Sequence, residues 1–293
     1  MDWIFLSFLA AFGQAFGWAL KKKTLENKGV NNTLGAVSFF SAGIILVIMW
    51  GVQSDWIVPA MTERFILATM IVIVLNIVAA WAGYRALNKA ALSTLMPFIA
   101  LTSLAIVPVE YLLRGILPSP LQIVGMVVVI AGAILFAAKK LPGKEALAAA
   151  GYFAVTLLCY SVTAPFMAVA VEESGSGLFS ATVFHLGIAV GFIPLMVRAK
   201  ESGVVSMLRT NGEWKKILWL MIATGGVIAL LENGPATIAL ETAKASEVFA
   251  IKRVMPFFAL ILGIIMFGEK VTRRHIAGTA LLVLGSMCII WFR

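Results

Sequence analysis

Charged residues, and the residue types that most often build catalytic or metal sites, are scarce in this chain. Of its 293 residues only 13% are Asp, Glu, Lys or Arg, and it has two histidines and two cysteines. Hydrophobic residues make up 61%, and the mean hydropathy is +0.99. This composition is too apolar for a soluble globular domain of that length. We therefore expect an integral membrane protein that contacts the lipid bilayer.

The scarcity of cysteine excludes a disulfide framework. Cys159 and Cys288 both fall inside long apolar runs, where cysteine behaves as a small buried residue. Two cysteines also cannot build a metal site without help from histidine. The sequence contains no nucleophile and base pair, metal-ligand cluster, phosphate-binding glycine loop or nucleotide fingerprint. We expect no enzyme, no metal, no cofactor and no step driven directly by ATP.

Long polar segments are missing as well, so no stretch remains for a soluble domain. Apolar runs of about 18 to 25 residues, each able to cross a hydrocarbon core of about 30 Å, recur between short polar breaks. They predict an all-α, multi-pass protein with ten transmembrane helices. The predicted helices are Trp3–Leu20, Leu34–Val52, Phe65–Leu87, Ala91–Leu113, Leu121–Ala138, Leu147–Val171, Leu178–Val197, Ile217–Leu240, Ser246–Phe267 and Ile276–Phe292.

The basic residues indicate topology rather than a binding surface for nucleic acid. The net charge is +9, but lysines and arginines lie in the breaks between spans and not on one polar face. Lys21, Lys22 and Lys23 follow the first apolar run and none precedes it, which is typical of a retained helix and not of a cleaved signal peptide. Seventeen of the 23 lysines and arginines lie in or beside the loops after odd-numbered helices. The positive-inside rule then predicts that both termini are outside.

The two halves of the chain repeat. A shift of 153 positions superposes the fourth and fifth helices on the ninth and tenth without a gap. The matched pairs include Ala90 and Ala243, Ser93 and Ser246, Gly125 and Gly278, and Gly132 and Gly285. Five helices per repeat is an odd number, so the second copy enters the membrane inverted. We predict repeats at residues 1–140 and 141–293, with a substrate cavity between them near the membrane midplane.

Two adjacent cations, Lys252 and Arg253, occur inside the apolar ninth helix. On a helical wheel they share one face with Ser246, Phe249 and Pro256. Charges at such depth usually serve function, although long basic side chains can also extend to the membrane surface. An arginine fork suits phosphate or carboxylate, and lysine adds a compact charge. The pair predicts a site for an anionic group.

Glu232 lies at a similar depth in the eighth helix, so it can meet the two cations. It is either a counter-ion that neutralises them or a group whose protonation is coupled to transport. Asn233, which follows it, belongs to the predicted site, and Gly234 and Pro235 predict a kink because proline lacks a backbone donor.

Further polar or amphipathic residues fall within other predicted spans. His185 either binds substrate or satisfies a backbone carbonyl, and the remaining ones either line the cavity or pack between helices. These remaining candidates are Gln14, Trp18, Asn76, Tyr84 and Tyr160. Glu110 and Arg114 are four residues apart and predict an interfacial ion pair, whereas Glu172 and Glu173 predict a solvated rim.

The sequence resembles a known family. Its ten spans divide as five and five, WALKKK follows the first apolar run, and residues 267–278 place a Gly-Glu pair at a helix end before a polar turn and a glycine. These features are similar to the EamA group of the drug/metabolite transporter superfamily, although the first half has Gly115-Ile116-Leu117-Pro118 at the equivalent place. The Lys252-Arg253 pair also resembles a pair in the plastid triose-phosphate translocators, a branch of the same superfamily, where it binds phosphate.

Together these features predict a secondary transporter in the prokaryotic cytoplasmic (inner) membrane. Its two halves would alternate access around a central cavity, with Lys252 and Arg253 binding a small anionic metabolite and with proton coupling through Glu232. Two alternatives remain. One is an exporter of amino acids or amphipathic drugs with the same fold, and the other is a membrane scaffold or enzyme subunit that transports nothing. The sequence predicts no oligomeric state.

Overall fold

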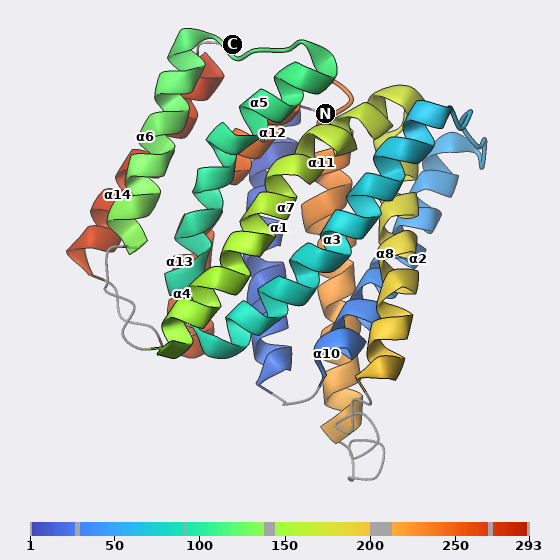
Figure 1. Ribbon diagram of the computed structural model, residues 1–293, viewed down its shortest axis with the longest axis horizontal. Coiled ribbons are helices and arrows are strands. Elements are labelled where there is room, and N and C mark those ends of the chain that lie inside the picture. The colour runs from blue at the N-terminus through green and yellow to red at the C-terminus, as the bar shows by residue number, and fades with distance from the viewer. Residues whose placement is uncertain are drawn as a thin grey trace.

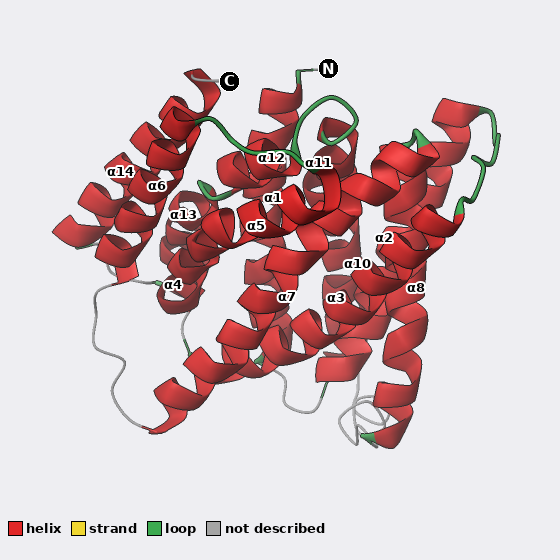
Figure 2. Cartoon of the chain, turned by 45° about the horizontal axis from the view of Figure 1, so that its top comes forward, coloured by secondary structure: helices red, strands yellow, loops and turns green. Residues whose placement is uncertain are grey.

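The computed structural model describes residues 2–26, 30–90, 92–137, 144–199, 213–268 and 272–291. These residues form helices joined by short loops, and no strand occurs among them (Figure 2). Both termini lie at the same end of the bundle (Figure 1). We call this end the terminus face. It includes the beginnings of α1 and α12 and the ends of α5 and α7.

The prediction of an all-α protein with ten transmembrane spans is confirmed. Seven spans consist of one helix each, and three consist of consecutive shorter segments. The single helices are α1 (Trp3–Leu25), α2 (Asn31–Ser54), α3 (Glu63–Lys89), α6 (Pro120–Ala137), α7 (Lys144–Ser174), α8 (Gly177–Arg198) and α14 (Arg273–Trp291). The broken spans are α4 (Leu92–Leu95) with η1 (Met96–Leu101) and α5 (Thr102–Arg114), α10 (Glu213–Val227) with η2 (Ile228–Asn233) and α11 (Gly234–Ala239), and α12 (Ala245–Lys252) with α13 (Met255–Phe267).

The prediction that the ninth span is one continuous helix is wrong. Helix α12 ends at Lys252, and α13 begins at Met255 with Pro256 in its first turn. Proline has no N–H to donate and its ring collides with the preceding turn, so the α-helical ladder stops there. The break comprises Arg253 and Val254, so one predicted anion-binding residue lies in the break and the other, Lys252, is the last residue of α12.

The eighth span departs from regular geometry where a kink was predicted, but over a longer segment. Ile228–Asn233 form a π-helix, and α11 starts at Gly234. The N–H of Gly234 donates to the carbonyl of Ala229, five residues earlier. Such π-helical turns inside α-helices frequently occur at functional sites.

The helix bounds follow the same shift of 153 positions as the sequence repeat. Helices α5 and α13 begin at Thr102 and Met255, and they end before Gly115 and Gly268. Both glycines adopt the left-handed conformation, with φ of +66° and +65°, which ends a helix at no steric cost only in glycine. The Glu269-Lys270-Val271 part of the family-like motif lies outside the described residues.

Helix α1 lies at the centre of the bundle. It contacts α10, η2 and α11 along one side and α12 and α13 along another, while α3 packs on α7 and α2 packs on α8. Helices α6 and α14 pair with each other at one edge (Figure 1). The outer faces carry exposed apolar side chains, for example Leu67, Met70 and Val74 along α3. Such a belt suits contact with lipid.

Candidate functional site

A cavity lies between α1, α2, α3, α7, η2 and α12, and we call it the central cavity. The volume that the centre of a water molecule can occupy in it is about 50 Å³. One water needs about 10–15 Å³ of such volume, so the cavity has room for only a few waters. Seven predicted site residues line it, namely Gln14, Asn76, Tyr160, Glu232, Asn233, Lys252 and Arg253. Lys21, Phe39, Thr163, Met167, Ile228 and Phe249 line it as well.

The side chains of Lys252 and Arg253 are both 2% exposed, so neither extends to the membrane surface. The ring of Phe249 lies one turn earlier on α12, 5.1 Å from Lys252 Nζ and 5.9 Å from Arg253 Cζ. Arg253 Nε is buried without a hydrogen-bond partner, and neither cation forms an ion pair within the described ranges. The helix break therefore presents two buried cations to the central cavity with their charges unmatched by any direct contact.

Glu232 comes from the π-helical segment and is held close to α1. A methyl group on Gly17 would lie 3.4 Å from Glu232 Oε2, and one on Gly13 would overlap the carbonyl of Leu231. These two glycines let α1 approach the backbone of η2. Glu232 Oε2 is buried without a hydrogen-bond partner, and no cation of the described part of the chain lies within 4.0 Å of the carboxylate. The predicted meeting with Lys252 and Arg253 occurs within one cavity, but not as an ion pair.

Lys21 was not among the predicted site residues. The run of three lysines was interpreted as a loop after a helix that ends at Leu20, but α1 continues to Leu25. Lys21 is 5% exposed, lines the central cavity and has its Nζ 5.2 Å from the ring of Trp18. The spacing offered a signal, because Lys21 follows Gln14 by seven positions and so shares its helix face.

The other two lysines of the run have different roles. Lys22 Nζ donates to the carbonyls of Leu87 and Ala90, at 2.5 and 3.1 Å, and so satisfies acceptors at the end of α3. Lys23 is exposed and forms an ion pair of 2.8 Å with Glu26. Three consecutive residues of one type thus lie in a cavity, at a helix end and on the surface.

Three predicted site residues lie behind the cavity lining. His185 donates from Nδ1 to the carbonyl of Ala181 at 2.6 Å, and its Nε2 lies 2.9 Å from the amide nitrogen of Asn233. It therefore orients a residue that lines the cavity. Trp18 packs against Phe153 with ring centroids 6.0 Å apart, and Tyr84 is buried 6.2 Å from Phe192 by the same measure.

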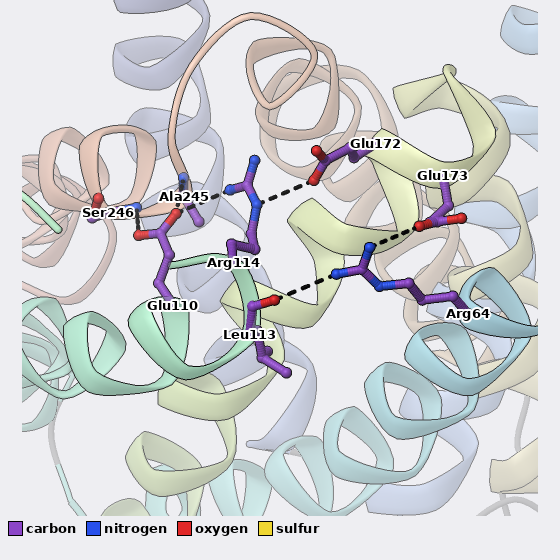
Figure 3. Close-up of polar contacts among 8 residues, drawn as sticks. All are labelled: Arg64, Glu110, Leu113, Arg114, Glu172, Glu173, Ala245 and Ser246. Carbon is purple, nitrogen blue, oxygen red and sulfur yellow. Dashed lines mark hydrogen bonds and ion pairs between the residues drawn. The ribbon is translucent and has the colours of Figure 1, made fainter. Parts of the chain in front are cut away.

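A second group of charges joins α5, α7 and α12 at the terminus face (Figure 3). The two oxygens of Glu110, which is fully buried, accept from the N–H groups of Ala245 and Ser246, both at 2.9 Å. A carboxylate is favoured at this place because the first N–H groups of a helix have no partner within the helix. Arg114 contacts Glu110 at 3.1 Å, as predicted, and Glu172 at 3.2 Å.

A neighbouring pair extends this group to α3. Arg64 contacts Glu173 at 3.2 Å and donates to the carbonyl of Leu113, while the hydroxyl of Thr62 donates to Glu173 at 2.7 Å. Glu172, whose side chain is 59% exposed, lies on a solvated rim as predicted, whereas Glu173 is only 19% exposed; both carboxylates also form ion pairs, which were not predicted. We call Arg64, Glu110, Arg114, Glu172 and Glu173 the terminus-face network.

Comparisons with known proteins support the architecture. A comparison with curated protein sequences gives no match. A crystal structure, described only as that of a protein, superposes with a TM-score of 0.68 over 96% of this chain and 95% of its own, at 15% identity. That likeness shows the same fold. The EamA-like transporter family matches residues 1–138 and again residues 147–291, which are the two five-helix repeats. The chain therefore belongs to the EamA-like transporter family.

Proposed function

We propose that this transporter moves a small anionic metabolite through the central cavity by alternating access, as a secondary transporter in the cytoplasmic (inner) membrane. The observation that carries the proposal is the pair of buried cations, Lys252 and Arg253, at the break between α12 and α13. A buried charge without a partner destabilises a protein by several kcal/mol. A ligand that supplies the opposite charge explains why such a pair is retained.

The size of the central cavity supports an occluded conformation. Small-molecule sites occupy about 300–1,000 Å³, whereas this one holds about 50 Å³ for water-sized spheres. A second cavity of about 430 Å³ opens at the terminus face beside Arg114, Glu172 and Lys244. Along α7, Met167 lines the central cavity and Val171 lines the second one, and these residues are four positions apart, which is about 6 Å.

The terminus-face network lies where the two cavities come closest along α7, so we assign it as the gate on that side. Opening would require Arg114 to leave Glu172, and the start of α12 to leave Glu110. On the opposite side, Lys22 ties the end of α1 to the end of α3, and Asn88 donates to Asn31 at 3.1 Å. These contacts form the second gate.

A binding screen tests the proposed substrate class. Purified protein would be titrated with phosphate monoesters, carboxylates, amino acids and neutral sugars, with the rise in unfolding temperature as readout. We expect anionic compounds to stabilise the protein, followed by their uptake into reconstituted vesicles without ATP. Strongest stabilisation by a ligand without negative charge would overturn the proposal.

A second candidate is an exporter of amino acids or amphipathic amines. It is favoured by Glu232, whose Oε2 is buried in the described structure without a hydrogen-bond partner and so can accept from an ammonium group. The same screen separates the two candidates. Amino acids and amines would then stabilise the protein more than anions of equal size, and Glu232→Gln would remove that effect.

We further propose that the terminus face is the outer one. The distribution of basic residues supports this orientation, because the terminus face carries few of them. Two of those few, Arg64 and Arg114, are engaged in ion pairs. Reporter fusions at Arg293 test the orientation. A reporter that is active only in the cytoplasm would reverse it and would make the terminus-face network the inner gate.

A further inference from the structure

Lys21 gives the central cavity a third buried cation. Its side chain is 5% exposed, and it makes no ion pair with any described residue. Its Nζ is 5.2 Å from the ring of Trp18, which is itself fixed between Phe153 and Gly83. The lysine is therefore held in position by packing, with its charge available to the cavity.

The cavity carries more positive than negative charge. Lys21, Lys252 and Arg253 line it together with one carboxylate, that of Glu232. Because these groups share one small cavity, the carboxylate of Glu232 attracts the two lysines, and the lysines repel each other. Three cations and one carboxylate leave an excess of two positive charges. A ligand with two negative charges would neutralise this excess, whereas a monoanion would leave one charge unmatched in a poorly solvated site.

The residues that line the cavity are spread along α1. Gln14 and Lys21 both line it and are seven residues apart, which is about 10 Å at 1.5 Å per residue. Lys252 and Arg253 reach the cavity from α12, which is a different helix. The cations thus come from two helices, so a single phosphate or carboxylate need not contact all of them.

We infer that Lys21 binds a second anionic group, so that the transported metabolite is a dianion with two separate negative groups. This inference rests on the proposed function, in which Lys252 and Arg253 hold the first group. Lys21 is then a residue that determines specificity. It selects dianions over monoanions of the same size and shape.

Matched ligand pairs test the inference. Purified wild type would be titrated with dicarboxylates from malonate to adipate, and with the monoamide of each, which has nearly the same shape and one negative charge fewer. One charge-assisted contact corresponds to about tenfold or more in affinity. We therefore expect at least one dicarboxylate to bind about tenfold or more tightly than its monoamide. Lys21→Met should reduce the preference to about twofold or less and leave the affinity for the monoamide unchanged.

Lys23→Met is the matched control, because it removes a charge from the same run but from an exposed side chain, and it should change neither affinity. Equal weakening of both ligands by Lys21→Met, or an intact preference, would overturn the inference. Binding of monoanions or phosphate that depends on Lys252, with no preference for any dicarboxylate, would also overturn it while the proposed function stands. Tightest binding of a neutral ligand would instead contradict the proposed function.

Unfolding without ligand gives an independent readout. If Lys21 serves a ligand, its unpaired charge destabilises the empty protein, so Lys21→Met should raise the unfolding temperature relative to Lys23→Met. A structural role predicts the reverse, because the substitution would then remove a stabilising contact. A lower unfolding temperature for Lys21→Met would contradict the inference even before a ligand is known.

Discussion

The central cavity and the terminus-face network both contain buried charges, but only in the network do these charges form ion pairs and hydrogen bonds. Glu110 is fully buried and binds Arg114 and two backbone N–H groups, whereas Lys252 and Arg253 are equally buried and form no ion pair in the described residues. Complete buried pairs hold segments together, and removal of one partner is costly. A buried charge without a partner reduces stability, and it is retained where a ligand supplies the opposite charge. The comparison distinguishes residues that hold the fold from residues that are proposed to bind a ligand.

The two regions share the short helix α12. Its first N–H groups are bound by Glu110, and its last residue is Lys252 in the central cavity. Its eight residues span only about 12 Å at 1.5 Å per residue. In the proposed mechanism, an anion that binds Lys252 would therefore act on the same short helix that Glu110 holds at the terminus face, and this would couple binding to the gate.

The largest expected effect on stability comes from Glu110→Ala. The substitution leaves the guanidinium of Arg114 and the N–H groups of Ala245 and Ser246 without their acceptor, at a cost of about 3–5 kcal/mol. Thermal unfolding in detergent should show a marked fall in the unfolding temperature. Glu26→Ala, which breaks an exposed pair with Lys23, is the control and should change little. Equal unfolding temperatures for the two variants would show that the network does not hold the fold.

The next effect concerns ligand affinity in the cavity. Arg253→Lys keeps the charge but loses the planar fork, so binding of an anionic ligand should weaken by about 1.5–3 kcal/mol, or about tenfold or more. Titration calorimetry on the purified variant measures this change. Arg198→Lys, the same substitution at an exposed position, serves as the control. Unchanged affinity in Arg253→Lys would remove Arg253 from the proposed site.

Glu232→Gln should alter the pH dependence of transport more than stability. The carboxylate forms no ion pair within the described chain, so its neutral analogue should leave the protein folded. If protonation of Glu232 is coupled to turnover, uptake into vesicles should become nearly independent of pH in the variant. A pH profile identical to that of the wild type would instead assign Glu232 a purely electrostatic role.

The smallest effect is expected at the exposed edge of the network. The side chain of Arg64 is 58% exposed, and exposed ion pairs contribute only about 0–1 kcal/mol. Arg64→Met should therefore leave the unfolding temperature nearly unchanged, and high salt should have little further effect. A fall in the unfolding temperature as large as that of Glu110→Ala would mean that burial does not determine which ion pairs of the network stabilise the fold.

Most of the fold could be predicted from the sequence, because ten apolar runs of membrane-spanning length leave few alternatives. The shift of 153 positions also predicts equivalent helix ends, down to the left-handed Gly115 and Gly268. Hydrophobicity alone does not predict where the eighth and ninth spans break. Pro235 indicated a kink in the eighth span, but not the π-helical segment before it, which lies where α1 approaches closely, as Gly13 shows against the backbone of Leu231. Pro256 ends the α-helical ladder after Lys252.

The candidate site was predictable where a charge interrupts an apolar run, as at Glu232, Lys252 and Arg253. Lys21 was not predicted because it adjoins two lysines in different environments, one at a helix end and one on the surface. Only the packing around α1 determines which of the three is buried in the cavity. For His185 and Tyr84 the sequence left two roles open, lining the cavity or a structural contact, and His185 does satisfy a backbone carbonyl, that of Ala181. Both side chains lie behind the cavity lining, a distinction that composition does not contain.

Thermal unfolding of Lys252→Met, without and with an anionic ligand that stabilises the wild type, tests the central claim most directly. If the unmatched cations of the cavity exist to bind an anion, the variant without ligand should unfold at a higher temperature than the wild type. Its stabilisation by the ligand should be largely lost. A variant that unfolds at a lower temperature and is still stabilised by the ligand as strongly as the wild type would contradict the account.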